Sequence, residues 1–494
     1  MMETTTPGQT FWRIVMLLHR ATRSLLWSTA LLLLPAFGGA QGFALNEIGT
    51  CAVGRSFAAT AGGCSDASLI FWNPAGTVRL NGWSVLAGTA AISLNGAFKR
   101  DTNGNRYESD IPVAIVPHVF INHHAKGSKL SLGAGLYVPY GLQSQWGDSF
   151  PGRFTSKNAK LQTIYVQPNI AWQLNDDWSI GGGPIWATSS VELEQAIDLS
   201  SNIAAPATAT TPAITFAQLG IPKYTEIGRA HIEGSGTGLG AQVGIMGKVN
   251  DRWTIGARYL LPITFKYKSG DAVFRQINTG LVFAGPLTGI PAGTQVDTLV
   301  GKSFLPTGRL SPQHVSTQIT HPAQVQVGFN YSGMKAWNIE VDYQWTQWSR
   351  FKELPVNFDT VSLSKTLVED YKNSSALRIS AEHAFTNGAR FRLGVSGVTT
   401  AAPDVTVSPL LPEQERAYYT GGGSYPLFGN LTLDGSVAYI ATLGRRGRTD
   451  EYPGLRRYDW KGDIAPSPIG PTQINNGVYT LKAYIFSVSL KASY

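Results

Sequence analysis

The sequence is poor in charge, in cysteine and in long apolar runs, and each deficit excludes a class of protein. Charged residues make up 15% of its 494 residues, against about 25% in an ordinary soluble domain. Two cysteines cannot support a disulfide-rich scaffold. Beyond the N-terminus, no apolar run reaches the length of about 18 residues that a spanning helix needs. An ordinary soluble protein, a disulfide scaffold and a helical transporter are therefore excluded.

Glycine (54 residues), tryptophan (13) and tyrosine (19) are abundant. Low charge together with many glycines and aromatics, and without long apolar runs, is typical of a membrane β-barrel. The formal net charge of +8 is mild for a chain of this length. Such a balance suits a surface that touches anionic lipid headgroups and does not indicate nucleic acid as a partner.

The N-terminus has the three-part layout of a secretory signal peptide. Arginines precede the apolar residues 25–34, and small residues at 38–40 then form a cleavage site. The apolar core is too short for a membrane anchor, so we predict that residues 1–40 are a signal peptide. Their removal takes away Arg13, Arg20, Arg23 and Glu3, three positive charges and one negative, and lowers the net charge from +8 to +6.

Cys51 and Cys64 both follow the predicted cleavage site closely. Exported proteins meet oxidising conditions, so we predict a disulfide, which would stabilise a loop of about 14 residues by roughly 3 kcal/mol. The alternative is a pair of buried free thiols. No histidine lies near either cysteine in the sequence, and no metal site is predicted.

Side chains alternate between apolar and polar along several segments, with the period of two that defines a β-strand. In residues 337–346 the apolar face carries Trp337 and Trp345, and the polar face carries Glu340 and Asp342. Aromatic residues at both ends of the strands are the signature of membrane barrels. The final residues alternate in the same way and end on Tyr494. A terminal aromatic residue resembles the signal that the barrel assembly machinery reads.

Short turns and long irregular segments alternate along the chain, and counting them gives the number of strands. Six short turns, rich in Asn, Asp and Gly as tight hairpins require, and seven long segments make thirteen connections. We therefore predict an all-β, fourteen-stranded antiparallel transmembrane barrel over residues 83–494, with short periplasmic turns and long extracellular loops. The short turns are 124–128, 175–177, 250–252, 332–334, 387–388 and 428–430, and the long segments are 96–110, 141–159, 195–225, 269–316, 349–370, 398–411 and 443–477.

Residues 41–82 precede the predicted barrel and need a place to fold. They carry many apolar side chains, among them Phe43, Phe57 and Trp72. A fourteen-stranded barrel has a lumen wider than its own side chains can fill. We therefore predict that residues 41–82 form an N-terminal hatch, or plug, inside the lumen.

Several short motifs follow one another along the chain in a characteristic order. They are residues 42–47, 54–58, 66–68, the hatch motif Asn73, Pro74 and Ala75, and residues 140–142, 230–234, 345–351 and 412–416. In combination they resemble the FadL-type family of outer-membrane transporters for long-chain fatty acids, which includes relatives for aromatic hydrocarbons. The resemblance covers essentially all of the mature chain. The cysteine pair departs from the family's type members, and a disulfide there would limit how far the hatch moves.

The resemblance implies transport across the outer membrane of a Gram-negative bacterium, with long-chain fatty acids as the first expectation. Ligand is captured at the extracellular loops, bound in the lumen and released sideways through a gap where the third strand is kinked. Two groups of residues match the family's functional positions. They are Phe43, Arg229, Lys372 and Arg378 near the ligand, and Gly135, Pro139 and Gly141 at the lateral gate. For each basic residue the alternative is a charge that faces the wet lumen or the headgroups.

Other functions stay open on the sequence alone. One is an uptake channel for aromatic or alkane hydrocarbons, and a different class is a general porin or an adhesin barrel. The histidines are scattered and form no catalytic constellation, so we expect no enzyme activity, no cofactor and no metal. The expected partners are a hydrophobic small molecule, outer-membrane lipid with lipopolysaccharide, and the barrel assembly machinery. We expect a monomer.

Overall fold

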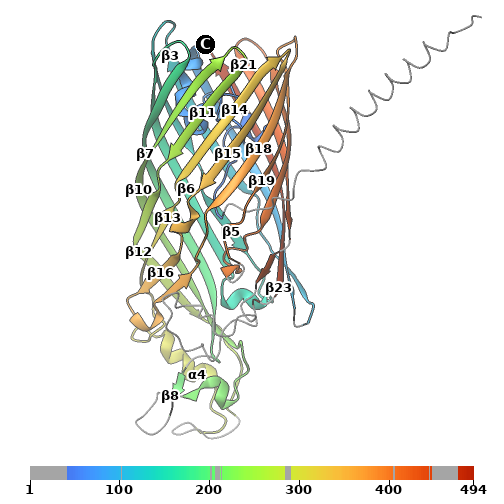
Figure 1. Cartoon of the computed structure of the whole chain (residues 1–494). Coiled ribbons are helices and arrows are strands. Elements are labelled where there is room, and N and C mark those ends of the chain that lie inside the picture. The colour runs from blue at the N-terminus through green and yellow to red at the C-terminus, as the bar shows by residue number, and fades with distance from the viewer. Residues whose placement is uncertain are drawn as a thin grey trace, which may run out of the picture. The chain divides into compact units, whose positions relative to one another are not determined.

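The chain forms a closed antiparallel β-barrel (Figure 1). It is seen in a computed structural model that describes residues 42–494 except 102, 201–202, 206–211, 213, 284–290, 404–405, 444, 448–474 and 476. The barrel closes because β1 (Gly82–Arg100) pairs with β23 (Gly477–Ser493) on one side and with β3 (Ala114–His124) on the other. Closure leaves no edge strand, whose unpaired backbone a bilayer could not solvate.

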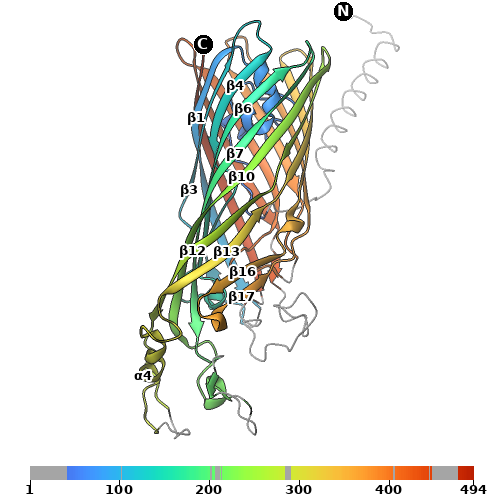
Figure 2. The same cartoon turned by 90° about the vertical axis from the view of Figure 1, so that its left-hand side faces the viewer.

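Fourteen barrel strands lie in the described part of the chain, as the alternation of turns predicts. Consecutive strands pair as antiparallel neighbours, and three barrel strands are each interrupted once. Short strands and helices lie in the long connections, at the lower end of Figure 2. The barrel strands after β3 are β4 (Leu130–Tyr137) with β5 (Gly141–Gln145), β6 (Asn158–Gln173), β7 (Trp178–Asp198), β10 (Glu226–Asn250), β11 (Trp253–Leu260) with β12 (Ile263–Gln276), β13 (Gln313–His321) with β14 (Gln324–Met334), β15 (Trp337–Thr346), β18 (Ser374–Ala384), β19 (Arg390–Val398), β20 (Glu415–Pro426), β21 (Leu431–Leu443) and β23.

The connections between the barrel strands carry further short strands and helices. In chain order they are β2 (Arg106–Glu108), η2 (Pro151–Phe154), β8 (Ile203–Ala205), β9 (Ile214–Thr215), η3 (Phe216–Leu219), α4 (Val296–Gly301), η4 (Lys302–Phe304), η5 (Trp348–Arg350), β16 (Glu353–Phe358), η6 (Val361–Leu363), β17 (Lys365–Val368) and β22 (Arg445–Gly447). The connections around β8 and α4 share a small apolar core that contains Phe216, Phe283 and Val296.

A proline stands at each of the three interruptions. Pro139 separates β4 from β5, Pro262 separates β11 from β12, and Pro322 separates β13 from β14. Proline has no backbone N–H and cannot donate to the ladder. The interruptions are therefore a local consequence of the sequence.

The wall presents apolar side chains to the outside and mostly polar ones to the lumen. Trp172, Trp253 and Trp337 are exposed near the short turns, and Trp186 and Tyr343 are exposed further toward the long connections. Valine, isoleucine, leucine and phenylalanine fill the outer face between these two levels. The band and its aromatic borders match the outer surface of a membrane barrel. Among the described residues, no helix is long and apolar enough to cross a membrane.

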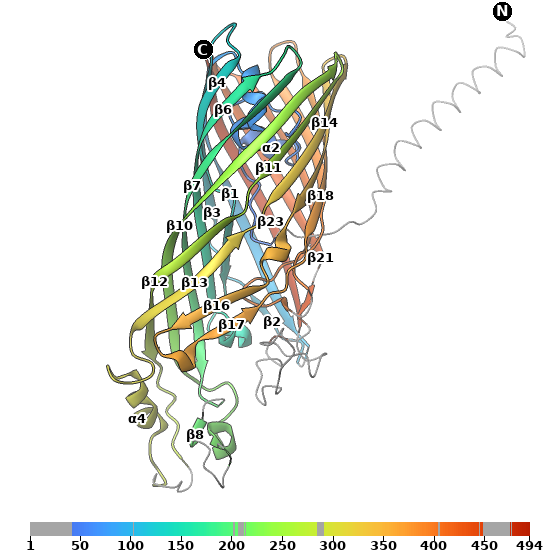
Figure 3. The same cartoon turned by 60° about the vertical axis from the view of Figure 1, so that its left-hand side comes forward.

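Residues 42–81, which we call the luminal segment, lie inside the ring of strands (Figure 3). The segment folds into α2 (Thr50–Gly54), α3 (Leu69–Trp72) and the 3-10 helix η1 (Pro74–Arg79). Asn73 begins η1: its side chain accepts a hydrogen bond from Ala75 N (3.2 Å) and donates to Thr60 O (2.8 Å) and to Ile245 O on β10 (3.0 Å). The motif Asn73, Pro74 and Ala75 thus starts a helix and attaches it to the wall.

Polar side chains of the wall hold the luminal segment by its backbone. Asp342 Oδ2 accepts hydrogen bonds from the N–H groups of Ala59 and Thr60, both at 3.0 Å. Glu340 Oε1 accepts one from Ala61 N at 2.6 Å, and its second oxygen pairs with the guanidinium of Arg55 at 3.4 Å. The polar face of β15 is therefore one of the faces of the wall that hold this segment.

A disulfide joins Cys51 in α2 to Cys64 in the loop before α3, with a Cα–Cα distance of 6.0 Å. Both cysteines are buried. The bond closes a loop inside the luminal segment and does not attach the segment to the wall. The predicted signal peptide, residues 1–40, lies outside the described residues.

We predict that Asp342→Ala loosens the luminal segment and leaves the barrel intact. The change strands two buried backbone N–H groups, at about 1–3 kcal/mol each. Hydrogen-exchange mass spectrometry of the reconstituted protein should show faster exchange at residues 59–61. Unchanged migration of the unheated protein on a gel should show that the barrel still forms. Asp251→Ala, at a residue 97% exposed in a short turn, is the matched control. Equal protection of residues 59–61 in the two variants would contradict the role of Asp342 in holding the luminal segment.

Candidate functional site

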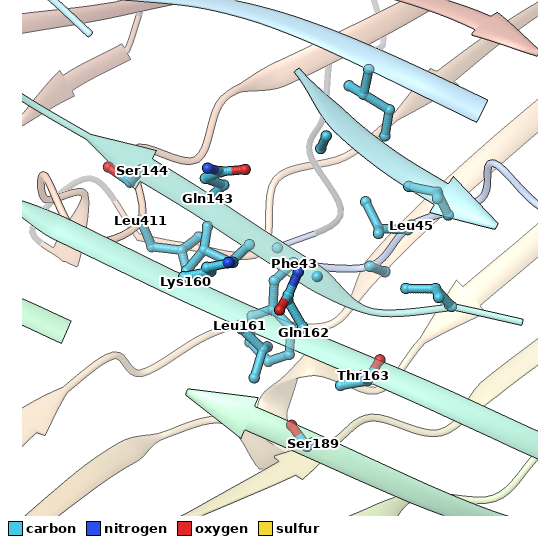
Figure 4. Close-up of a pocket in the computed structure, with 18 of the residues that line it drawn as sticks. Phe43, Leu45, Gln143, Ser144, Lys160, Leu161, Gln162, Thr163, Ser189 and Leu411 are labelled. Atoms are coloured by element: carbon cyan, nitrogen blue, oxygen red, sulfur yellow. The ribbon is translucent and has the colours of Figure 1, made fainter. Parts of the chain in front are cut away.

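A cavity of about 990 Å³ lies beside the start of the luminal segment (Figure 4). Its inner part is bounded by Phe43, Leu45 and Leu411, and by Ile440 and Leu481 of the wall. Its size falls at the upper end of the range of roughly 300–1,000 Å³ typical of small-molecule sites. The inner lining is mainly apolar, which suits a hydrophobic ligand.

The cavity reaches the outside through a window in the wall. Pairing between β3 and β4 ends at Val119 and Leu136, and β5 pairs with β6. Beyond the kink at Pro139, contact with the first long connection resumes only where Asp110 N donates to Gln145 O at 3.0 Å. Residues 111–112 and 114–117, with Val138 and Leu142 opposite, line the cavity between these limits.

The luminal segment supplies backbone partners at the kink. Leu45 N donates to Pro139 O (2.9 Å), and Gly141 N donates to Phe43 O (3.0 Å). Ala44 and Tyr140 form an isolated antiparallel bridge between these two bonds. Residues 43–45 therefore behave as a short strand added to the interrupted wall.

Aromatic rings enclose the side chain of Phe43. Its ring centroid lies 4.7 Å from that of Trp348, 5.4 Å from Phe351, 5.7 Å from His321 and 6.1 Å from Tyr140, each in an edge-to-face arrangement. Such pairs contribute about 0.5–1.5 kcal/mol beyond burial alone. A second, smaller cavity of about 60 Å³ lies against Phe43, and Phe43 and Leu411 line both. Phe43 thus stands between two apolar spaces.

Glu413 ties the first residues of the luminal segment to the long connection before β20. Its carboxylate accepts hydrogen bonds from Gly42 N (2.8 Å), Ala401 N (3.1 Å) and Ala402 N. Burial raises the pKa of Glu413 above its ordinary value, although these three donors oppose the shift. The carboxylate lines the cavity, so it is within reach of a bound ligand.

Arg416, three residues after Glu413, also lines the inner cavity, and no individual role is predicted for it from the sequence. Its guanidinium interacts with the Tyr418 hydroxyl and with the carboxylates of Glu413 and Glu47. The motif at residues 412–416 was the signal that could have found both Glu413 and Arg416. Hydroxyl, carboxylate and guanidinium groups together form a polar corner in an otherwise apolar space.

None of the three basic residues predicted near the ligand lines this cavity in the described part of the chain. Arg378 lies beneath the luminal segment and donates to Phe57 O (3.2 Å) and to Gln344 Oε1 (2.8 Å). Arg229 pairs with Glu226 and Asp148, both at 2.8 Å. Lys372 is exposed. Their roles in ligand binding stay predictions.

The predicted gate residues are partly brought together. Gly141 lines the cavity, and the Pro139 carbonyl meets the luminal segment at the kink. Gly135 lies in the paired part of β4, opposite Phe120. A Cβ atom at Gly135 would lie 2.5 Å from the Phe120 ring, so this glycine makes room for a neighbouring side chain. The structure groups Phe43, Pro139 and Gly141 at one place.

A closed barrel with an apolar outer band, a filled lumen and an apolar cavity defines an outer-membrane transport protein. The family model described as "Outer membrane protein transport protein (OMPP1/FadL/TodX)" matches residues 31–488. The chain belongs to this family. Its members are transport proteins of the Gram-negative outer membrane, and this chain is a transporter of hydrophobic compounds rather than an enzyme.

Individual relatives are distant in sequence and similar over nearly their whole length. A 47 kDa outer membrane protein of Pasteurella multocida is 24% identical over 85% of this chain and 91% of the relative. The long-chain fatty acid transport protein of Escherichia coli is 23% identical over 84% of this chain and 90% of its own length.

Solved structures show the same fold. A Pseudomonas aeruginosa FadL homologue superposes with a TM-score of 0.71 at 18% identity, covering 92% of this chain and 100% of that one. The toluene transporter TbuX of Ralstonia pickettii gives a TM-score of 0.59 at 16% identity, covering 89% and 98%. Relatives named for fatty acids and for toluene thus share one architecture.

The four rings around Phe43, those of Tyr140, His321, Trp348 and Phe351, are called the Phe43 cage. We predict that the connection beside this cage loosens as pH rises. Burial, with the negative charge of Glu413 nearby, raises the pKa of Glu369 from 4.5 to about 8. A raised carboxyl pKa gives stability that is full below about 4.5 and is lost as pH rises through about 8. Hydrogen-exchange protection of residues 369–373, corrected for intrinsic rates, should fall between about pH 4.5 and 8 and level off above that.

Glu369→Gln should remove this pH dependence, because the amide stays neutral throughout. Tyr371, two residues on, packs edge-to-face on Phe351 at 5.1 Å, so the effect should extend to the cage. A pH dependence of equal size in the Gln variant would show that another group is responsible.

Proposed function

We propose that this protein takes up long-chain fatty acids, binds them in the cavity beside Phe43 and releases them sideways through the window between β3 and β5. The observation that carries the proposal is the continuity of one mainly apolar cavity from the lumen to the outside of the wall. The relatives named as long-chain fatty acid transport proteins support the choice of ligand. The extracellular connections with the Phe216 core are the proposed place of first capture.

A fatty acid needs an apolar space for its chain and a cation for its carboxylate. The inner cavity offers both, because Leu45, Leu411 and Ile440 line it together with Arg416. We assign the carboxylate to Arg416. A ligand carboxylate at this corner competes with Glu413, which holds Gly42 N. Binding therefore favours release of residues 42–45 from their present positions.

Release of those residues opens the route out. Phe43–Leu45 occupy the inner side of the kink through their bonds to Pro139 and Gly141. When they move, the cavity meets the window without obstruction, and an apolar molecule passes into the lipid beside β3. The luminal segment as a whole stays in place through Asp342 and Glu340 and acts as the hatch.

We predict that Arg416→Gln weakens binding of oleate by about 10- to 100-fold, since a hydrogen bond to a charged group contributes about 1.5–3 kcal/mol. Binding of oleyl alcohol, which has no carboxylate, should change little. Isothermal titration of the purified protein in detergent measures both. Arg416→Lys should restore part of the affinity because it keeps the charge.

Lys372→Gln is the comparison variant, because Lys372 was the alternative position for the carboxylate. If that variant loses oleate affinity and Arg416→Gln does not, the carboxylate binds near Lys372. If oleate does not bind saturably to the unaltered protein, fatty acid transport itself is refuted.

We predict that Ala114→Trp obstructs the window and slows uptake. Ala114 lines the cavity from β3, where β3 pairs with β1 but not with β4. Uptake of labelled oleate by cells should fall several-fold, with oleate affinity of the purified protein unchanged. Ala134→Trp is the control, since Ala134 lies where β3 and β4 are fully paired. Undiminished uptake in the Ala114 variant would refute the lateral route.

A second candidate ligand is an aromatic hydrocarbon. The observation that favours it is the Phe43 cage, because four rings surround a side chain that has the shape of toluene. Saturable binding of toluene without binding of oleate would select this candidate. The buried luminal segment argues against a general porin. A large steady single-channel current would favour that function instead.

A further inference from the structure

The outer faces of β7 and β10 carry a strip of short polar side chains, namely Thr188, Ser190, Ser235 and Thr237. Ile164 of β6 lies opposite Thr188 of β7, which lies opposite Thr237 of β10. Two residues further along each strand, Gln162 lies opposite Ser190, which lies opposite Ser235. These residues point outward, because the residues between them on β6 and β7 are buried in the lumen.

The strip lies directly beyond the apolar band of the wall. On the side of the short turns it is bordered by Trp186, which is exposed, and by Leu239, which is 77% exposed. Short hydroxyl side chains beside such large ones form a shallow trough. Its level is that of the lipid headgroups in the outer leaflet, because Trp186 marks the border of the apolar band.

The trough ends at two lysines on β12, and it belongs to the same cavity as the window. Lys266 and Lys268 line that cavity together with Ser235 and Thr237. Both lysines are exposed, and neither takes part in an ion pair among the residues that the structure describes. Nearby cations differ in this respect, since Lys157 and Arg229 are each paired with carboxylates.

The local backbone fixes the position of these lysines. Every second residue of β10 from Gly234 to Gly240 is a glycine. A Cβ atom at Gly236 would lie 2.9 Å from Lys266 O, and one at Gly238 would lie 3.1 Å from Thr264 O. The main chain of β12 therefore packs closely against the glycines of β10. The register of β10 with β11 and β12 is interrupted between Glu233 and Gln242, so the two lysines lie beside a break in regular pairing.

We propose that this strip binds a phosphate group of the phosphorylated glycolipid in the outer leaflet and holds that lipid beside the lateral window. Hydroxyl donors and unpaired ammonium groups are the chemistry that recognises a phosphate. Charge complementarity selects the occupant, because the strip faces a layer of anionic headgroups. The inference needs the outer-membrane location and does not rest on the proposed cargo or route.

The test measures binding of bisphosphorylated lipid A to the full mature protein in detergent by native mass spectrometry. The Lys266→Gln/Lys268→Gln double variant should bind it about tenfold more weakly. Lipid A from which the phosphates have been removed should bind both proteins equally. Lys99→Gln is the matched control, since Lys99 is exposed on β1 and does not line the cavity.

A second variant tests the trough without changing charge. Ser190→Leu/Ser235→Leu fills it and should also weaken binding of the phosphorylated lipid, while unheated migration on a gel shows that the barrel is folded. The proposal is overturned if the lysine variant binds the phosphorylated lipid as tightly as the unaltered protein. It is also overturned if the lysine variant loses oleate and keeps the lipid, because the strip would then serve the cargo. Loss of oleate binding in Arg416→Gln alone leaves the lipid site unaffected.

Discussion

A break in the wall of a membrane barrel leaves backbone N–H and C=O groups that hydrocarbon cannot satisfy, and this constraint governs the arrangement around Pro139. The luminal segment supplies the partners, since Leu45 N donates to Pro139 O and Gly141 N donates to Phe43 O. The same short stretch places Phe43 among its aromatic neighbours. Emptying the cage and uncovering the kink are therefore one movement.

That movement has an energetic limit. In the proposed release it would break two backbone hydrogen bonds at the kink and the bond between Gly42 and Glu413, each with a net contribution of about 0.5–1.5 kcal/mol. It also separates Phe43 from four rings. A ligand shifts this equilibrium only by the difference in its affinity for the two states. Burial of an apolar chain in the vacated space provides such a difference, and a carboxylate that competes for Arg416 adds to it.

The sequence predicts the barrel well because its signals are local. A period of two marks each strand, and Asn, Asp and Gly mark the short turns, so fourteen strands follow without any long-range information. The contacts of the luminal segment are not local, since Ala59 and Asp342 are 283 positions apart. For the same reason the sequence could not place the basic residues. Arg378 and Arg416 both lie on inward faces, and only the fold shows that one meets the segment and the other meets the cavity.

The low overall charge of the chain is explained by where its ionisable side chains lie in the fold. Many of the ionisable side chains on the wall are turned inward, where Glu340 and Asp342 hold the luminal segment and Glu340 also pairs with its Arg55. The barrel itself is held by backbone ladders that close on themselves. Hydrogen bonds to residues 42–45 are few, at Pro139, Gly141 and Glu413, whereas each strand is held by a full ladder whose groups hydrocarbon cannot satisfy. Displacing residues 42–45 would therefore cost less free energy than opening the wall, so that in the proposed release these residues move while the barrel stays closed.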